Sequence, residues 1–231
     1  MAKPLAALEN CDRGINAMST HRSRILIADD HTLVADLCRT LLEKEFHVVG
    51  SVRDGRALIE SAIDLRPDVI IVDIAMPILN GLDAGQKVKE ILPAVKLVFL
   101  TMNPDPEIAA EAFRRGASGY LLKTSAADEM VLAVRRVLRG MSYISLPLSK
   151  ETVDYLRRQS KMPVEEEERL TLRQREVLQL LVEGKVMKEV AGILNMTTRT
   201  VAFHKYRIMD VLGARSSADL VRYAIRNHLV A

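Results

Sequence analysis

Five short apolar runs alternate with five longer amphipathic stretches between residues 24 and 140, and this rhythm constrains the fold more than any other feature. In the first amphipathic stretch, Leu33, Val34, Leu37 and Leu41 recur at helical spacing. Neighbouring parallel strands need long crossovers, which are usually helices. We therefore expect an α/β domain with a parallel sheet. The expected strands lie at 24–28, 46–50, 68–72, 95–100 and 118–122, and the expected helices at 31–45, 54–65, 82–91, 105–115 and 125–139.

The rhythm changes after residue 170, where the strand-like runs stop. Gly184 and Gly213 separate helical stretches, and Asn195 stands where a helix end favours a left-handed residue. Thr197 can cap the helix that follows it. This pattern therefore predicts a compact all-α domain. We expect its helices at 171–182, 187–194, 198–212 and 216–228.

The two rhythms divide the chain into domains. Between them we expect a linker with a short helix at 150–160, followed by Pro163 and four consecutive glutamates. The residues before the first strand match neither rhythm, which raises the hypothesis that translation begins at Met18. The expected division is a flexible extension at 1–22, an α/β domain at 23–142, a linker at 143–168 and an all-α domain at 169–231.

The composition argues against membrane and secreted proteins. The longest apolar stretch, 69–79, is interrupted by Asp73 and falls short of the ~18 residues that a membrane-spanning helix needs. The N-terminal segment lacks the continuous apolar core of a secretion signal. Cys11 and Cys38 form neither a metal motif nor a disulfide framework, which suits a reducing cytoplasm. We therefore expect a cytoplasmic protein with no membrane partner.

The net charge of +3 conceals an asymmetry. Residues 169–231 contain 11 Lys and Arg against 5 Asp and Glu, a balance of +6, whereas residues 1–168 have a balance of −3. A basic domain favours a polyanion partner such as nucleic acid. An ordinary solvated surface explains an excess of this size at least as well, so charge alone does not decide the partner.

Polar residues stand at the ends of four of the five expected strands. Asp29 and Asp30 follow the first strand and Asp73 follows the third, while Thr101 ends the fourth and Lys123 follows the fifth. In an open parallel sheet, ligands bind beyond the carboxyl ends of the strands, where the strand order reverses. With the order 2-1-3-4-5, the three carboxylates converge at that point. Acids at loop starts often only cap helices, but the joint pattern favours a shared site.

Converging carboxylates repel one another unless a cation lies among them, and Mg²⁺ prefers such oxygen ligands. Asp73 can then act as the nucleophile toward a phosphoryl group. The metal and Lys123 would neutralise charge on the transferring oxygens, and Thr101 offers a hydroxyl to the product. The pattern therefore indicates phosphoryl transfer to an aspartate.

Four sequence strings carry a family resemblance: ILIADDH (25–31), DVIIVDIAMPILNG (68–81), FLTM (99–102) and GASGYLLK (116–123). Through these strings the first domain resembles the response-regulator receiver domains. The resemblance implies a flavodoxin-like, doubly wound, five-stranded parallel sheet of order 2-1-3-4-5. It also implies a sensor histidine kinase, or a small phosphodonor, as the source of the phosphoryl group.

The resemblance assigns roles to individual residues. Asp73 is the implied phospho-acceptor, assisted by Thr101 and Lys123, and Tyr120 matches the aromatic residue of the family's switch. Such a tyrosine turns inward when Thr101 moves toward the phosphoryl group. The implied Mg²⁺ ligands are Asp29, Asp30, Asp73 and the backbone carbonyl of Ala75.

Residues 169–231 resemble the LuxR/NarL-type helix-turn-helix through LTLRQREVLQLLVEGK (170–185), KEVAGILNM (188–196), TTRTVAFHKYRIMDVLGARS (197–216) and ADLVRYAI (218–225). Together the two domains resemble a two-component response regulator of the NarL/FixJ family. This resemblance implies double-stranded DNA as a partner. It also implies a homodimer when the protein is phosphorylated or bound to DNA.

The helix expected at 198–212 has one apolar face, which includes Val201 and Ile208, and it carries no acid before Asp210. Such a helix suits the major groove. We expect His204 to pack within the domain. Candidate phosphate contacts, which position the protein without specifying sequence, are Lys188, Thr198, Arg199, Lys205 and Arg207; candidate base readers are Ala202, Phe203 and Tyr206.

Some residues depart from the family pattern, and two other functions stay open. Val186 and Met187 replace residues that are often small and polar, and Gly192 costs its helix about 1 kcal/mol relative to Ala.

One rival function is an aspartyl-phosphate phosphatase, which the lack of an obvious cap domain disfavours. We expect no enzyme beyond the receiver's own phosphoryl transfer and dephosphorylation. The other rival is a phosphorylation-independent DNA-binding regulator that uses its receiver for dimerisation.

Overall fold

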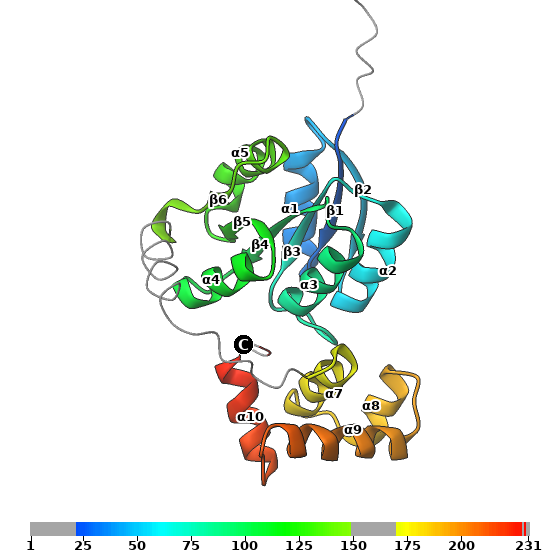
Figure 1. Cartoon of the computed structure of the whole chain (residues 1–231). Coiled ribbons are helices and arrows are strands. Elements are labelled where there is room, and N and C mark those ends of the chain that lie inside the picture. The colour runs from blue at the N-terminus through cyan, green and yellow to red at the C-terminus, as the bar shows by residue number, and fades with distance from the viewer. Residues whose placement is uncertain (1–21, 149–169, 228, 230–231) are drawn as a thin grey trace, which may run out of the picture.

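The first domain is a parallel sheet with helices on both faces, as Figure 1 shows. The computed structural model describes residues 22–148, 170–227 and 229. The expected strand order 2-1-3-4-5 is confirmed, and a short sixth strand extends it to β2-β1-β3-β4-β5-β6. The strands are β1 (Arg24–Ala28), β2 (His47–Val52), β3 (Val69–Asp73), β4 (Lys96–Thr101), β5 (Ala117–Leu122) and β6 (Tyr143–Ile144).

Two helices cover one face of the sheet and three cover the other, because the buried residues of each strand alternate between two apolar clusters. The first face packs on α1 (Thr32–Leu42) and α5 (Ala126–Leu138). The second packs on α2 (Gly55–Leu65), α3 (Gly81–Ile91) and α4 (Pro106–Arg114). This layering leaves the carboxyl ends of the strands free to carry a site.

Residues 143–148 differ from their expected place at the start of the linker, because they pack on the first domain. β6 pairs in parallel with β5. The buried Ser145 donates its N–H to the Tyr120 carbonyl at 2.9 Å, and its hydroxyl accepts the Leu122 N–H at 3.1 Å. Leu148 is buried in the same apolar cluster as β5. A two-residue strand carries no periodicity, so the sequence did not indicate it.

The loop between β3 and α3, residues 74–80, is closely packed at both ends. Asn80 caps α3 by accepting the N–H of Asp83 at 2.9 Å. Gly81 follows, and a Cβ atom placed there would lie 2.0 Å from the backbone oxygen of Asp73. Ile78 adopts a left-handed backbone with φ of 70°. A side chain at Gly81 would therefore push α3 away from the end of β3.

The second domain is all-α, as expected, and consists of α7 (Leu172–Val182), α8 (Met187–Ile193), α9 (Thr198–Val211) and α10 (Ser217–Arg226). Asn195 takes the left-handed conformation with φ of 51°. Thr197 caps α9 by accepting the Thr200 N–H at 3.1 Å. Val186 provides no side-chain cap for α8, but the Glu189 carboxylate accepts the Val186 N–H at 2.8 Å. The replacement at Val186 is thus partly offset.

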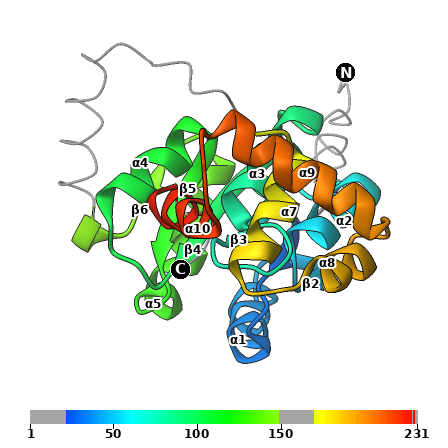
Figure 2. The same cartoon turned by 90° about the horizontal axis from the view of Figure 1, so that it is seen from below.

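The helical domain lies against the loop side of the sheet through α7. In Figure 1, α9 runs along the side farthest from the first domain, and Figure 2, seen from below, has α9 in front. Three expected features lie outside the described residues: the start at Met18, the helix at 150–160 and the glutamates of the linker. Within the described ranges, no helix is both long and apolar enough to cross a membrane.

Candidate functional sites

The carboxylates at the ends of β1 and β3 meet in one cluster at the carboxyl edge of the sheet, which we call the acidic pocket. One ligand atom each from Asp29, Asp30, His31 and Asp73 can be chosen so that all four lie within 4.8 Å of one another. Asp29 is 1% exposed and Asp73 is 2% exposed, whereas the Asp30 side chain is 33% exposed. The strand order explains the meeting, because β1 and β3 are neighbours and end at the same edge.

Lys123 reaches this pocket from the end of β5. Its Nζ lies 2.8 Å from Asp73 Oδ2 and 2.8 Å from Asp29 Oδ2. Burial disfavours its charge, but the two carboxylates outweigh burial and raise the pKa of the ammonium. Burial also raises the pKa of Asp73, against the opposing effect of Lys123. The pocket thus holds a lysine between two buried acids before any phosphoryl group arrives.

Ala75 follows β3 and Thr101 ends the neighbouring strand β4, and their roles at the site stay predictions. The Ala75 N–H donates to Asp73 Oδ1 at 3.2 Å, and Ala75 itself is exposed. The Thr101 hydroxyl accepts the Asn103 N–H at 3.0 Å. These contacts place a backbone turn on one side of Asp73 and a hydroxyl near the end of the neighbouring strand.

Tyr120 is already fully buried in this structure. Among the described residues, no group forms a hydrogen bond with its hydroxyl. Burial raises the pKa of Tyr120, and the nearby Thr101 hydroxyl opposes that shift. Burying the ring therefore requires no inward turn from this conformation, and a switch role for Tyr120 stays a prediction.

The donor atoms of the pocket fit a hard divalent cation. Asp29 Oδ2 and Asp30 Oδ1 are buried atoms without a hydrogen-bond donor in the described residues. The Lys123 ammonium lies within ion-pair distance of Asp29 Oδ2, and His31 Nδ1 lies 2.9 Å from Asp30 Oδ1, but neither contact has hydrogen-bond geometry. Oxygen atoms in this state favour a cation, because buried carboxylates are costly unless paired.

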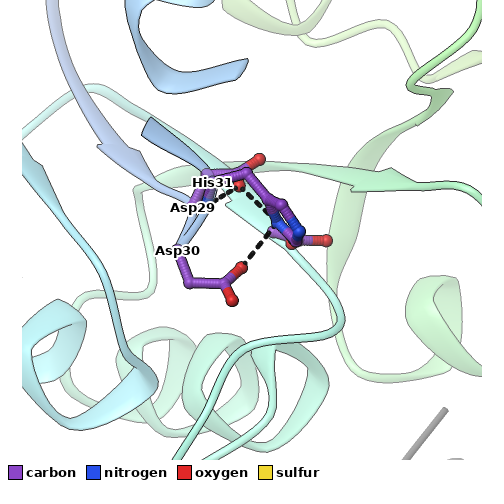
Figure 3. A group of neighbouring side chains, drawn as sticks. Asp29, Asp30 and His31 are labelled. Carbon is purple, nitrogen blue, oxygen red and sulfur yellow. Dashed lines mark hydrogen bonds and ion pairs between the residues drawn. The ribbon is translucent and has the colours of Figure 1, made fainter. Parts of the chain in front are cut away.

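His31 also faces the pocket, and the sequence reasoning did not single it out. Its Nδ1 lies 2.9 Å from Asp30 Oδ1 and 3.4 Å from Asp29 Oδ1, and Figure 3 shows the ring nitrogen directed at both carboxylates. The signal was its position directly after the acidic pair, at the last residue of the β1–α1 turn.

The loop that follows Asp73 is bonded to the helical domain. Gln179 of α7, which is 2% exposed, accepts the Asn80 N–H at 2.8 Å and donates to the Met76 carbonyl at 2.8 Å. Ile78 packs against the core of the helical domain, and Leu172 packs against the core of the first domain. We call these contacts, together with the arginine pair described next, the domain joint.

Arginines from both domains converge on Asp83, close to the Gln179 contacts. Arg115, after α4, lies 2.5 Å from Asp83 Oδ1, and Arg175 of α7 lies 3.1 Å from the same atom. Burial disfavours the charge of Arg115, but Asp83 and Glu111 outweigh it and raise the pKa of the guanidinium. No single-domain motif predicted this joint, because its partners lie about a hundred residues apart.

The outer face of α9 carries the candidate DNA contacts. Phe203 is 62% exposed and Tyr206 is 69% exposed, and Arg199 is exposed one turn before Phe203. His204 is half-buried, with its ring 5.8 Å from that of Phe203. Among the other candidates, Ala202 and Lys205 are half-buried, and Lys188, Thr198 and Arg207 are exposed.

Comparison with known families gives two matches that follow the domain order. Residues 25–135 match the model described as "Response regulator receiver domain". Residues 168–224 match the model described as "Bacterial regulatory proteins, luxR family".

Two curated relatives align with nearly the whole chain. The oxygen regulatory protein NreC of Staphylococcus epidermidis is 34% identical over 215 residues, which cover 90% of this chain and 99% of the relative. NreC of Staphylococcus aureus is 32% identical over 214 residues, with the same coverage.

Solved response regulators have a similar structure. The RcsB response regulator of Salmonella typhimurium is 27% identical with a TM-score of 0.54, and the match covers 88% of this chain and 98% of that one. An RcsB–DNA complex is 28% identical with a TM-score of 0.54, and covers 87% of this chain and 97% of that one.

Proposed function

The chain belongs to the two-component response regulators that join a receiver domain to a LuxR-type DNA-binding domain, and we propose that phosphorylation of Asp73 controls its binding to DNA. The observation that carries the proposal is the pocket itself: Asp73 lies with two further acids and Lys123 at one edge of the sheet. Family membership makes the protein a regulator of transcription, and supports no enzymatic role beyond the receiver's own chemistry.

In the transfer step, a carboxylate oxygen of Asp73 attacks the phosphorus of a phosphohistidine or a small acyl phosphate. The bond to the donor breaks, and the donor keeps the electron pair. Lys123, 2.8 Å from Asp73, is placed to pair with the oxygens of the incoming group. The Thr101 hydroxyl and the Ala75 N–H would bond the phosphorylated side chain.

Asp29, Asp30 and the carbonyl of Ala75 would hold Mg²⁺ with Asp73. When bound, the ion supplies positive charge that neutralises the transferring oxygens. The protein's own part is to keep the acids converged and buried, so that this charge acts at a fixed place.

We propose that the domain joint transmits the change at Asp73 to the helical domain. Met76 and Asn80 lie within seven residues of Asp73, and both bond Gln179. A movement of the loop therefore acts directly on α7. Because α9 lies on the opposite side of the helical domain, the joint does not cover the proposed DNA-reading face.

Two helical domains would then bind half-sites about one DNA turn apart, as a phosphorylated or DNA-bound homodimer. The relatives support this assembly, because RcsB has been solved as dimers bound to DNA. A cytoplasmic location agrees with this role and with the free thiol of Cys38.

The proposal is tested by acetyl-phosphate labelling with Mg²⁺, followed by intact mass measurement. We expect Asp73→Asn to lose the added phosphoryl group. Asp64→Asn, which changes an exposed acid of α2, is the matched control and should label normally. Normal labelling of Asp73→Asn would refute the site.

The link to DNA is tested separately, by measuring promoter affinity with and without the phosphodonor. We expect the donor to change affinity in the wild type and not in Asp73→Asn. Equal affinities in the wild type with and without donor would favour the phosphorylation-independent regulator.

The joint is tested with Gln179→Ala. This variant should label normally, but the ratio of DNA affinities with and without donor should move toward one. Gln86→Ala on α3 is the control, because it removes a glutamine outside the bonds described for the joint. An unchanged ratio in Gln179→Ala would exclude Gln179 as the link.

A further inference from the structure

His31 occupies the N-cap position of α1 without using its side chain as a cap. Residues at this position usually bond a first-turn N–H through a side-chain oxygen. Instead, the Nδ1 atom lies 2.9 Å, 3.4 Å and 4.0 Å from oxygens of Asp30, Asp29 and Asp73 respectively. The His31 backbone N–H is itself held by Asp29 Oδ1 at 2.8 Å. The imidazole is thus anchored beside the acids.

The spacing of these atoms suits a single ion. Metal–ligand distances are about 2.0–2.2 Å, so opposite ligands of one ion lie about 4–4.4 Å apart. The four candidate ligand atoms lie within 4.8 Å of one another, and one of them is the imidazole nitrogen. Small side-chain rotations therefore bring three oxygens and one nitrogen onto one ion.

We propose that His31 Nδ1 coordinates a metal ion held by the acidic pocket. This nitrogen ligand makes the site favour divalent ions of the first transition row over Mg²⁺. The inference rests on the proposed acidic site. Imidazole suits ions such as Co²⁺ and Ni²⁺, whereas Mg²⁺ prefers oxygen and keeps its waters. The neutral imidazole offers its Nδ1 lone pair to the metal and carries its hydrogen on Nε2.

Ligation is tested with Mn²⁺ as a spectroscopic probe on full-length, tag-free protein. Pulsed electron paramagnetic resonance detects the coupling of an imidazole nitrogen to bound Mn²⁺. We expect the coupling in the wild type and its loss in His31→Asn. His47→Asn is the matched control, because His47 is exposed at the start of β2. The acids lie at the other end of the strands.

Selectivity is tested by calorimetric titration with Co²⁺ and Mg²⁺. In His31→Asn, the ratio of Co²⁺ to Mg²⁺ affinity should fall at least about tenfold, which is the smallest loss expected from removing a group that tunes a metal site. His47→Asn should keep the wild-type ratio. An unchanged ratio in His31→Asn would overturn the proposal.

Two further outcomes separate this inference from the acidic site beneath it. If Mg²⁺ and Mn²⁺ bind the wild type without nitrogen coupling, the acidic site stands and the role of His31 is overturned. If the affinity for both ions is unaffected by Asp30→Asn, the acidic site is itself wrong, and both proposals are overturned.

Discussion

The acidic pocket and the outer face of α9 are built in opposite ways. In the pocket, Asp29 and Asp73 are almost fully buried, and Lys123 lies between them. On α9, Phe203 and Tyr206 are 62% and 69% exposed. Phosphoryl transfer benefits from charges that are fixed before the reaction, because no reorganisation is then needed. Reading DNA requires groups that remain open until the groove covers them.

The same contrast extends to the packing around each region. The first residue of α3, Gly81, has no room for even one methyl group beside the end of β3, whereas a Cβ atom at Gly192 in α8 would have no neighbour within 4 Å. The receiver site is supported by close backbone packing, and the helical domain tolerates change at its surface. Substitutions in the two regions test this contrast.

The largest effect is expected from Lys123→Ala. Removing the cation that pairs with Asp73 should slow labelling by acetyl phosphate about 100-fold, because a fixed charge on the transferring oxygens is lost. The rate of phosphoryl incorporation measures this. The control Lys44→Ala removes an exposed lysine and should label at the wild-type rate. A rate within threefold of wild type, as a rough limit, would show that the pocket does not depend on its lysine.

Gly81→Ala should destabilise the receiver by about 2.5 kcal/mol. The added Cβ would lie 2.0 Å from the Asp73 carbonyl, so α3 must shift and strain the loop. Urea unfolding of the full chain measures this effect. A loss below about 1 kcal/mol would mean that the loop is looser than the packing indicates.

Phe203→Ala should weaken binding to specific DNA by about 2 kcal/mol if the exposed ring meets apolar base edges, as we propose. Binding to unrelated DNA should change little, and competition titrations with both sequences separate the two effects. Leu33→Ala, at an exposed apolar residue of α1, is the control. Equal losses on both DNAs would remove Phe203 from the base-reading set.

Lys205→Ala should weaken binding to all sequences. The slope of log affinity against log salt should become shallower by about one, since one phosphate contact is lost. Affinities measured over a range of salt concentrations test this. A loss confined to one base position would instead make Lys205 a base reader.

The smallest effect is expected from Gly192→Ala, which should stabilise the helical domain by about 0.5–1 kcal/mol. Alanine favours a helix over glycine, and no neighbouring atom opposes the added methyl group. Thermal unfolding of the full chain measures the change. Destabilisation would mean that this face of α8 is covered by a partner that the structure does not contain.

The strand order was implied by the resemblance to receiver domains, since periodicity within one strand does not record its neighbours. The sequence predicted the second domain's class and the helix bounds to within about three residues, because hydrophobic periodicity and cap residues record these features locally. It also indicated which acids would meet, since the ends of β1 and β3 follow from the strand order. The sequence did not predict the joint at Gln179, because an isolated glutamine on an amphipathic helix does not indicate a partner ninety-nine residues away. The sequence also did not predict that His31 turns toward the acids, because this orientation depends on a side-chain rotamer.

The short β6 has a consequence for assembly. An edge strand offers unpaired backbone groups that can recruit a strand from another molecule. Here the chain places Tyr143–Ile144 along β5 and secures the following turn through Ser145. A second copy therefore cannot pair its backbone with Gly119 and Tyr120 of β5, because β6 already pairs there.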